Sequence, residues 1–197
     1  MRIRRSIAVL GIVVLTGGLA TAPVGAEPRS PDPAAPSPRG PACTITGTSG
    51  RDRLVGTPGD DVICGGRGAD VLLGRGGADT LLGGRGGDDI NGGGGDDAYL
   101  YGDKGPDVIS GDDGADATLG GGDGNDYVYG GEGDDGLLSG GFGDDSIFGE
   151  GGSDFCLYSQ DGIEGNDYVD GGADSDNGQT DLGDSIWDLE TFVVCVL

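Results

Sequence analysis

The sequence predicts an all-β fold, a flattened solenoid in which two short strands complete each coil. Three observations lead to this prediction: 47 of the 197 residues are glycine, these glycines recur at a fixed spacing, and an aliphatic residue follows at a fixed place in each recurrence. A chain this rich in glycine is usually disordered unless its glycines are periodic. The periodicity therefore indicates a repetitive fold in place of disorder.

Two segments precede the repeats. Residues 1–26 have the layout of a secretory signal, with three arginines in the first five residues, an apolar run over residues 7–19 and small residues at 24–26. We therefore expect export by the general route; an uncleaved N-terminal anchor and twin-arginine export are the alternatives. Residues 27–42 hold six of the nine prolines without apolar periodicity, which predicts an extended linker.

A nine-residue unit then repeats, with Gly at positions 1 and 4, Asp at position 6 and an aliphatic residue at position 8. From Gly92 the units alternate between ten and nine residues. Reading the longer units strictly in nines would place Thr118 and Cys156 at the apolar position, whereas an extra residue after the Asp places a leucine there each time. The second register gives thirteen aliphatic residues that we predict to point inward: Leu54, Ile63, Leu72, Leu81, Ile90, Leu100, Ile109, Leu119, Val128, Leu138, Ile147, Leu157 and Val169.

The alternation of ten and nine residues is explained if two units form one coil. All ten-residue units then lie on the same side, and the extra residue becomes a bulge repeated along one of two sheets. The prediction is a roll of about 13 nine- to ten-residue turns, two turns per coil, over residues 43–170. Residues 171–197 lose the repeat, and their apolar cluster (Ile186, Trp187, Phe192, Val193 and Val194) is expected to cap the last coil.

The repeat G-G-x-G-x-D-x-U-x resembles the RTX, or haemolysin-type, calcium-binding nonapeptide. Its double-glycine form is complete at six places: residues 65–70, 83–88, 92–97, 121–126, 130–135 and 140–145. The resemblance implies a parallel β-roll in which each Ca²⁺ ion lies between neighbouring turns on one edge, held by loop carbonyls and by the Asp at position 6. The metal ligands it implies are Asp52, Asp61, Asp70, Asp79, Asp88, Asp97, Asp107, Asp116, Asp126, Asp135, Asp145, Asp154 and Asp167.

The residue types suit calcium, which binds six to eight oxygen atoms from carboxylates and carbonyls. The acids at position 5 (Asp60, Asp96, Asp134 and Asp144) are expected to face solvent. Residues 47–91 carry seven acids and five arginines, and residues 92–170 carry twenty acids and one lysine, so the second half is the stronger calcium candidate. A solvated acidic tract and a metal-free solenoid with Asp as turn caps are the alternatives. The metal-free alternative is strongest for the first two units, whose loops contain threonine and proline.

The four cysteines lie in the part of the chain that follows the signal, which favours disulfides. Of the three possible connectivities we favour Cys43–Cys64 and Cys156–Cys195, because each bridge would then fasten one end of the roll. Cys156 adjoins the inward Leu157 and is expected to point outward. A zinc site is disfavoured, because the chain has no histidine and no Cys-x-x-Cys spacing.

Composition also excludes several functions. Without histidine, neither a Ser-His-Asp triad nor a Cys-His pair can form, and a formal net charge of −24 excludes the usual nucleic-acid-binding classes. We predict a secreted, extracellular protein that binds several Ca²⁺ ions, folds upon binding them, has no enzymatic activity and has no membrane span after signal cleavage. The alternative is an extracellular adhesion or surface-interaction module, although the mixed outward residues argue against a flat recognition array.

Overall fold

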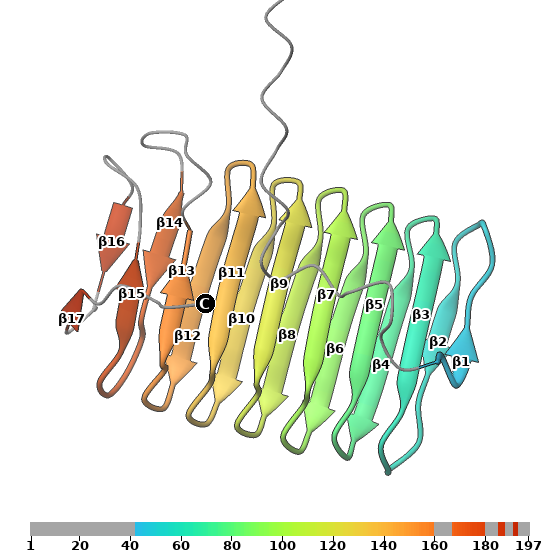
Figure 1. Cartoon of the computed structure of the whole chain (residues 1–197), viewed down its shortest axis with the longest axis horizontal. Helices are drawn as coiled ribbons and strands as arrows, with labels where there is room; N and C mark the ends of the chain where they lie inside the picture. Colours follow the sequence, from blue (N-terminus) through green and yellow to red (C-terminus); the bar gives the residue numbers. More distant parts are fainter. Residues whose placement is uncertain (1–41, 160–166, 180–184, 188–190, 193–197) are drawn as a thin grey trace, which may run out of the picture. The chain divides into compact units, whose positions relative to one another are not determined.

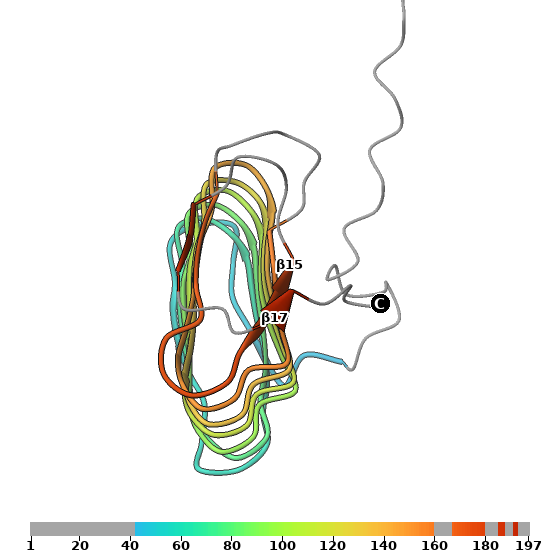
Figure 2. The same cartoon turned by 90° about the vertical axis from the view of Figure 1, so that its left-hand side faces the viewer.

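A computed structural model describes residues 42–159, 167–179, 185–187 and 191–192, all within the compact unit Pro31–Leu197. These residues form seventeen short strands in two parallel sheets. Figure 1 shows the strands side by side along the roll, and the end-on view of Figure 2 shows that each coil is flattened, with one sheet on either side. Within these ranges, no helix is long and apolar enough to cross a membrane.

Every second strand belongs to the same sheet, because the chain crosses to the opposite sheet after each strand. The nine-stranded sheet, here called sheet A, contains β1 (Ile45–Thr46), β3 (Val62–Arg67), β5 (Thr80–Arg85), β7 (Tyr99–Lys104), β9 (Thr118–Asp123), β11 (Leu137–Phe142), β13 (Cys156–Tyr158), β15 (Asn177–Gln179) and β17 (Thr191–Phe192). The eight-stranded sheet B contains β2 (Arg53–Val55), β4 (Val71–Gly76), β6 (Asp89–Gly94), β8 (Val108–Asp113), β10 (Tyr127–Glu132), β12 (Ser146–Gly151), β14 (Tyr168–Asp170) and β16 (Ser185–Trp187).

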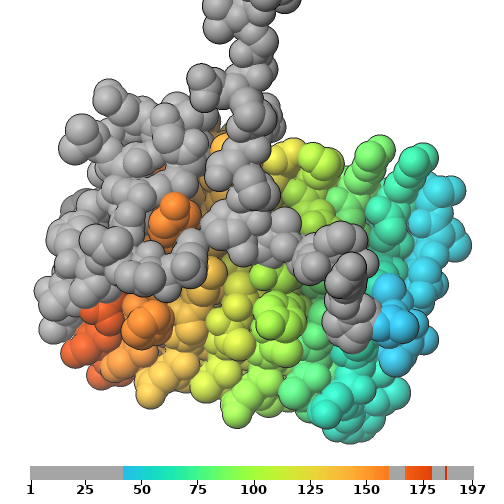
Figure 3. Space-filling model, viewed as in Figure 1, coloured from blue at the N-terminus to red at the C-terminus, as the bar shows by residue number. Residues whose placement is uncertain are grey.

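The predicted all-β solenoid is confirmed, while the predicted number of turns is only roughly matched. The thirteen repeat units supply β2 to β14, but β1 precedes them and β15 to β17 follow. Strand pairing therefore continues into the segment expected to be a cap: Ile186 aligns with Val169, and Phe192 aligns with Gly178. Val193 and Val194 lie outside the described residues. The space-filling view shows the successive coils as adjacent bands of colour along the roll (Figure 3).

The core is the predicted inward column of aliphatic side chains. Twelve of its thirteen members are at most 1% exposed, and Leu54 in the first coil is partly buried against them. In sheet A, Leu81 aligns with Leu100 and Leu100 with Leu119, across the point where the units lengthen. This alignment confirms the register that places the extra residue directly after the Asp.

The extra residues form the predicted bulge along one sheet. They are Ala98, Ala117, Gly136 and Phe155, and each directly precedes a strand of sheet A. The N–H of Gly136 donates to the carbonyl of Asp116 (2.7 Å), and the N–H of Leu137 donates to the carbonyl of Ala117 (3.0 Å). Each bulge thus repeats the hydrogen bonding of the one before it, and the coil lengthens on this side without disturbing the core.

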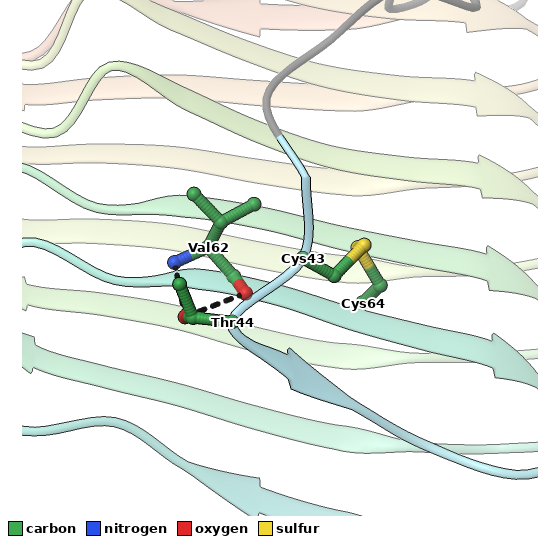
Figure 4. Close-up of a disulfide and its surroundings, with 4 residues drawn as sticks. All are labelled: Cys43, Thr44, Val62 and Cys64. Atoms are coloured by element: carbon green, nitrogen blue, oxygen red, sulfur yellow. Dashed lines mark hydrogen bonds between the residues drawn. A yellow bond between two sulfur atoms is a disulfide. The ribbon is translucent and has the colours of Figure 1, made fainter.

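A disulfide closes the N-terminal end of the roll, as predicted. It joins Cys43, before β1, to Cys64 in β3, with the two Cα atoms 5.9 Å apart (Figure 4). Beside it, the hydroxyl of Thr44 donates to the carbonyl of Val62 (3.1 Å) and accepts the N–H of the same residue (3.0 Å). Cys195 lies outside the described residues, so the second pair stays a prediction.

Candidate metal site

The predicted ligands line both edges of the roll, where the chain crosses between the sheets. Those preceding strands of sheet B form the first ladder, which contains Asp52, Asp70, Asp88, Asp107, Asp126, Asp145 and Asp167. Those preceding strands of sheet A form the second ladder, with Asp61, Asp79, Asp97, Asp116, Asp135 and Asp154. All of them except Asp52 are at most 8% exposed. The structure therefore gathers the predicted carboxylates into two buried rows.

Backbone hydrogen bonds orient each carboxylate. From Asp70 and Asp79 onward, one oxygen, Oδ1, accepts the N–H of the corresponding Asp one coil nearer the N-terminus. The N–H of Asp97 donates to Oδ1 of Asp116 at 2.8 Å, and the N–H of Asp116 donates in turn to Oδ1 of Asp135 at 2.9 Å. The same bond recurs along the first ladder, for example from Asp107 to Asp126 (2.8 Å). Because the bond joins neighbouring coils, the stacking of the coils sets the direction in which each carboxylate points.

The other carboxylate oxygen, Oδ2, is buried without a hydrogen-bond partner at eight positions in the two ladders. They are Asp70, Asp79, Asp88, Asp97, Asp107, Asp116, Asp135 and Asp154. A buried charged oxygen without a compensating contact is strongly unfavourable. A cation beside these oxygens would provide that contact. The orphaned oxygens are therefore the observation that fits a metal ion.

Backbone carbonyls approach the same oxygens. A Cβ atom on Gly111 would lie 1.9 Å from Oδ2 of Asp116 and 2.4 Å from the carbonyl oxygen of Gly130 in the next coil. Position 1 therefore has no room for a side chain, and the two atoms that approach it are both hydrogen-bond acceptors. Carboxylate and carbonyl oxygens are the ligands that calcium prefers. Among the described residues, no group of three or more Asp, Glu or Cys side chains could hold a metal ion by itself, so an ion here would also need the carbonyls as ligands.

Burial changes the acidity of the ladders. It is the largest cause that raises the pKa of Asp97, Asp107 and Asp135 to about 7 and that of Asp154 to about 6. The backbone N–H bound to each carboxylate lowers its pKa, and neighbouring carboxylates raise it again, as Asp116 does for Asp135. At these four positions the raised pKa favours the protonated carboxyl below about neutral pH in the metal-free roll, and a bound cation would displace the proton.

The acids at position 5 are exposed, as expected, but they do more than add charge. Oδ1 of Asp60 accepts the N–H of Ala78 in the next coil (2.9 Å), and Oδ1 of Asp134 accepts the N–H of Ser153 (2.9 Å). These exposed bonds run parallel to the buried ladders. They were not anticipated, because nothing in the spacing shows which backbone group lies above position 5.

Sequence reasoning also missed a member of the second ladder. Asp176 is 1% exposed, and its Oδ1 accepts the N–H of Asp154 at 2.9 Å. Its unit begins at Gly171 but has Asp174 at position 4 and Gly178 at the aliphatic position, so it fails the repeat pattern. The spacing could have identified it: Asp176 follows Asp154 by 22 residues, the same interval that separates Asp145 from Asp167 in the first ladder.

Comparison with known proteins bears on the same residues. The family model described as the RTX calcium-binding nonapeptide repeat (4 copies) matches residues 44–72, 65–99, 98–121, 118–137 and 136–160, which together are more than half of the chain. No curated protein matches the chain.

Proposed function

Because the chain belongs to the RTX calcium-binding nonapeptide repeat family, we propose that it is an exported, non-enzymatic protein whose roll folds as its loops bind several Ca²⁺ ions. The observation that carries the proposal is the row of buried Oδ2 atoms without hydrogen-bond partners. Family membership supports calcium as the ion, and the two ladders extend the proposal to named residues.

The ligands would come from neighbouring loops on one edge. In the second ladder, Oδ2 of Asp97, Asp116 and Asp135 would contribute carboxylates to successive ions, and carbonyls such as those of Gly111 and Gly130 would contribute the neutral oxygens. When bound, calcium supplies the positive charge that compensates these oxygens. The protein's part is to hold the carboxylates in register through the Oδ1 bonds and to keep position 1 free of side chains.

Folding and binding are expected to be coupled because the roll has a thin core and a high density of buried acids. Each coil between Ile63 and Val169 buries two aliphatic side chains between the sheets, together with one carboxylate at each edge. Above about pH 7, ionised carboxylates within one ladder repel one another in the metal-free state. A metal that binds only the folded arrangement adds its binding free energy to folding.

Export is supported by the disulfide between Cys43 and Cys64, since such bonds persist mainly in oxidising compartments. The predicted signal, residues 1–26, lies outside the described residues. Detection of a mature N-terminus at Glu27 in the culture medium would test this part of the proposal.

The surface-interaction alternative is less well supported. Outward aromatic rings lie on sheet B, with the ring centroids of Tyr129 and Phe148 4.9 Å apart and those of Phe148 and Tyr168 5.5 Å apart. The rings of Tyr129 and Phe148 are nearly parallel and stack on one another between neighbouring coils. These contacts bind coil to coil, so they favour a stabilising role over a regular array for a partner.

Calcium titration followed by calorimetry and far-UV circular dichroism tests the proposal. We expect β structure to appear as calcium is added, with more than one ion bound per chain and an affinity in the extracellular range of about 10⁻⁴ to 10⁻³ M. Magnesium at the same concentration is the control for general screening. Identical spectra in a calcium-free buffer and in millimolar calcium, without heat of binding, would refute it.

A further inference from the structure

The first loop of each ladder is built differently from the loops that follow. In residues 47–52, the N–H and the hydroxyl of Thr48 both donate to Oδ2 of Asp52, at 2.6 and 2.8 Å. In residues 56–61, Thr57 makes the same two bonds to Asp61, at 2.6 and 2.9 Å. The Oδ2 atom, which has no hydrogen-bond partner at the eight positions named above, therefore has two protein donors here.

The backbone explains the difference. Position 2 has a positive φ, between 70° and 116°, in every other described loop: Gly66, Arg75, Gly84, Gly93, Asp103, Asp112, Gly122, Gly131, Gly141, Glu150 and Gly172. Thr48 and Thr57 do not, as expected for β-branched residues, which strongly disfavour positive φ. With an ordinary φ at position 2, the loop turns its own N–H and hydroxyl toward the carboxylate.

The rest of the first coil is also closed without metal. The Cys43–Cys64 disulfide and the bonds between Thr44 and Val62 attach β1 to β3. Residues 43–67 contain three aspartates and three arginines, so this coil carries no net charge. Residues 68–85 are also neutral but have the orphaned oxygens of Asp70 and Asp79, and the coils after them are acidic. Neither charge repulsion nor an orphaned carboxylate oxygen of its loops opposes its folding.

We propose that residues 43–67 form a calcium-independent cap, in which Thr48 and Thr57 take the chemical place of the ion. Ion binding would then begin with the loops that follow, at residues 65–70 on the first ladder and 74–79 on the second. The cap offers these loops a template, because the N–H of Asp52 is bonded to Oδ1 of Asp70 (2.8 Å) and that of Asp61 to Oδ1 of Asp79 (2.7 Å). The template role rests on the proposed calcium-dependent folding of the later coils. The folding of the cap without calcium does not depend on that proposal.

Hydrogen exchange on the purified protein, with its disulfide intact, tests the cap. We expect the amides of residues 44–67 to be protected in both calcium-free and calcium-saturated buffer, and those of residues 80–158 to be protected only with calcium. No protection anywhere without calcium would overturn the cap and leave the proposed function standing. Protection throughout without calcium would instead refute calcium-coupled folding, and with it any distinction between cap and roll.

Glycine at the two threonine positions tests whether the bonds from Thr48 to Asp52 and from Thr57 to Asp61 take the place of the ion. The double variant Thr48→Gly with Thr57→Gly restores the residue that most other loops have at position 2 and removes both hydroxyls. We expect residues 44–67 to lose their protection without calcium and to regain it when calcium is added. Ser49→Gly, one residue away in the same loop, leaves the threonine bonds intact. It is the matched control and should leave the calcium-free protection of residues 44–67 unchanged. Unchanged calcium-free protection in the double variant would overturn the proposal.

Ion counting by calorimetry locates the first site. Asp52→Asn with Asp61→Asn should leave the number of bound ions unchanged, whereas Asp107→Asn with Asp116→Asn should lower it. An equal loss from both pairs would show that the first loops bind calcium and would overturn the inference alone. If neither pair of substitutions lowered the number of bound ions, the ladder carboxylates would not be ligands. The proposed function and the proposed starting point of binding would then both be refuted.

Discussion

Protons should partly replace calcium in folding the roll. Burial raises the pKa of Asp97, Asp107 and Asp135 to about 7 and that of Asp154 to about 6. An acid whose pKa is higher in the folded state stabilises that state at low pH and loses this contribution as the pH rises through the folded value. Without calcium, lowering the pH from 8 to 5 should therefore favour the folded roll.

The size of the effect follows from the pKa values. An acid whose pKa changes from 3.8 in the unfolded chain to about 7 in the folded roll adds about 3 kcal/mol to the free energy of unfolding when the pH falls from 8 to 5. The corresponding contribution of Asp154 is about 1 kcal/mol. The four groups together give about 10 kcal/mol, an upper limit because neighbouring carboxylates in one ladder titrate as a coupled set. This is comparable to the whole stability of a small domain.

Far-UV circular dichroism in calcium-free buffer at pH 8 and pH 5 is the assay. We expect more β structure at pH 5, with light scattering to exclude aggregation, since the sequence pI is near 4.1. A variant with asparagine at positions 97, 107 and 135 should show more structure at pH 8 and a weaker pH dependence, whereas Asp134→Asn, at an exposed position, should behave like the unmodified protein. A calcium-free chain that is equally unstructured at both pH values would refute the reasoning.

Three further predictions concern single positions. Asp135→Ala should raise the calcium concentration needed for folding much more than Asp134→Ala, because only Asp135 has a buried Oδ2. Equal shifts in the midpoint of calcium titrations followed by circular dichroism would mean that the acids act only as diffuse charge. Leu119→Ala should lower stability in saturating calcium by about 3 kcal/mol, measured by urea unfolding, because its side chain is fully buried; a loss below about 1 kcal/mol would contradict its place in the core. Peptide mapping without reduction should recover Cys156 linked to Cys195, and a link from Cys156 to another partner would disprove the predicted pairing.

The repeat made most of the fold predictable, because one spacing sets strand, turn and core position together. The choice of register illustrates this: placing leucine at 119 and 157, in preference to Thr118 and Cys156, predicted the column that forms the core. The degenerate unit around Asp176 could not be recognised in the same way. Its register is set by pairing with the preceding coil, which the local pattern does not record.

The carboxylates of the candidate site could be named from the sequence, but the differences among them could not. Position 6 of each unit could be named from the spacing, yet the sequence does not show which of the two carboxylate oxygens is bonded. Thr48 and Thr57 are visible in the sequence as departures from glycine, which makes a metal-free first coil an alternative. Their two bonds to Asp52 and Asp61 depend on the sign of a backbone angle, which only the three-dimensional structure shows.

The bulge along sheet A makes the complete coil the unit by which such a chain can be lengthened or shortened. Removing residues 102–120 would join Tyr101 to Gly121, and the next Asp would still enter the first ladder. Removing only residues 102–110 would send every later Asp to the opposite edge and the bulges to the opposite sheet. A gene that grows by internal duplication can therefore add whole coils freely, whereas adding a single repeat would exchange the two edges of the protein downstream.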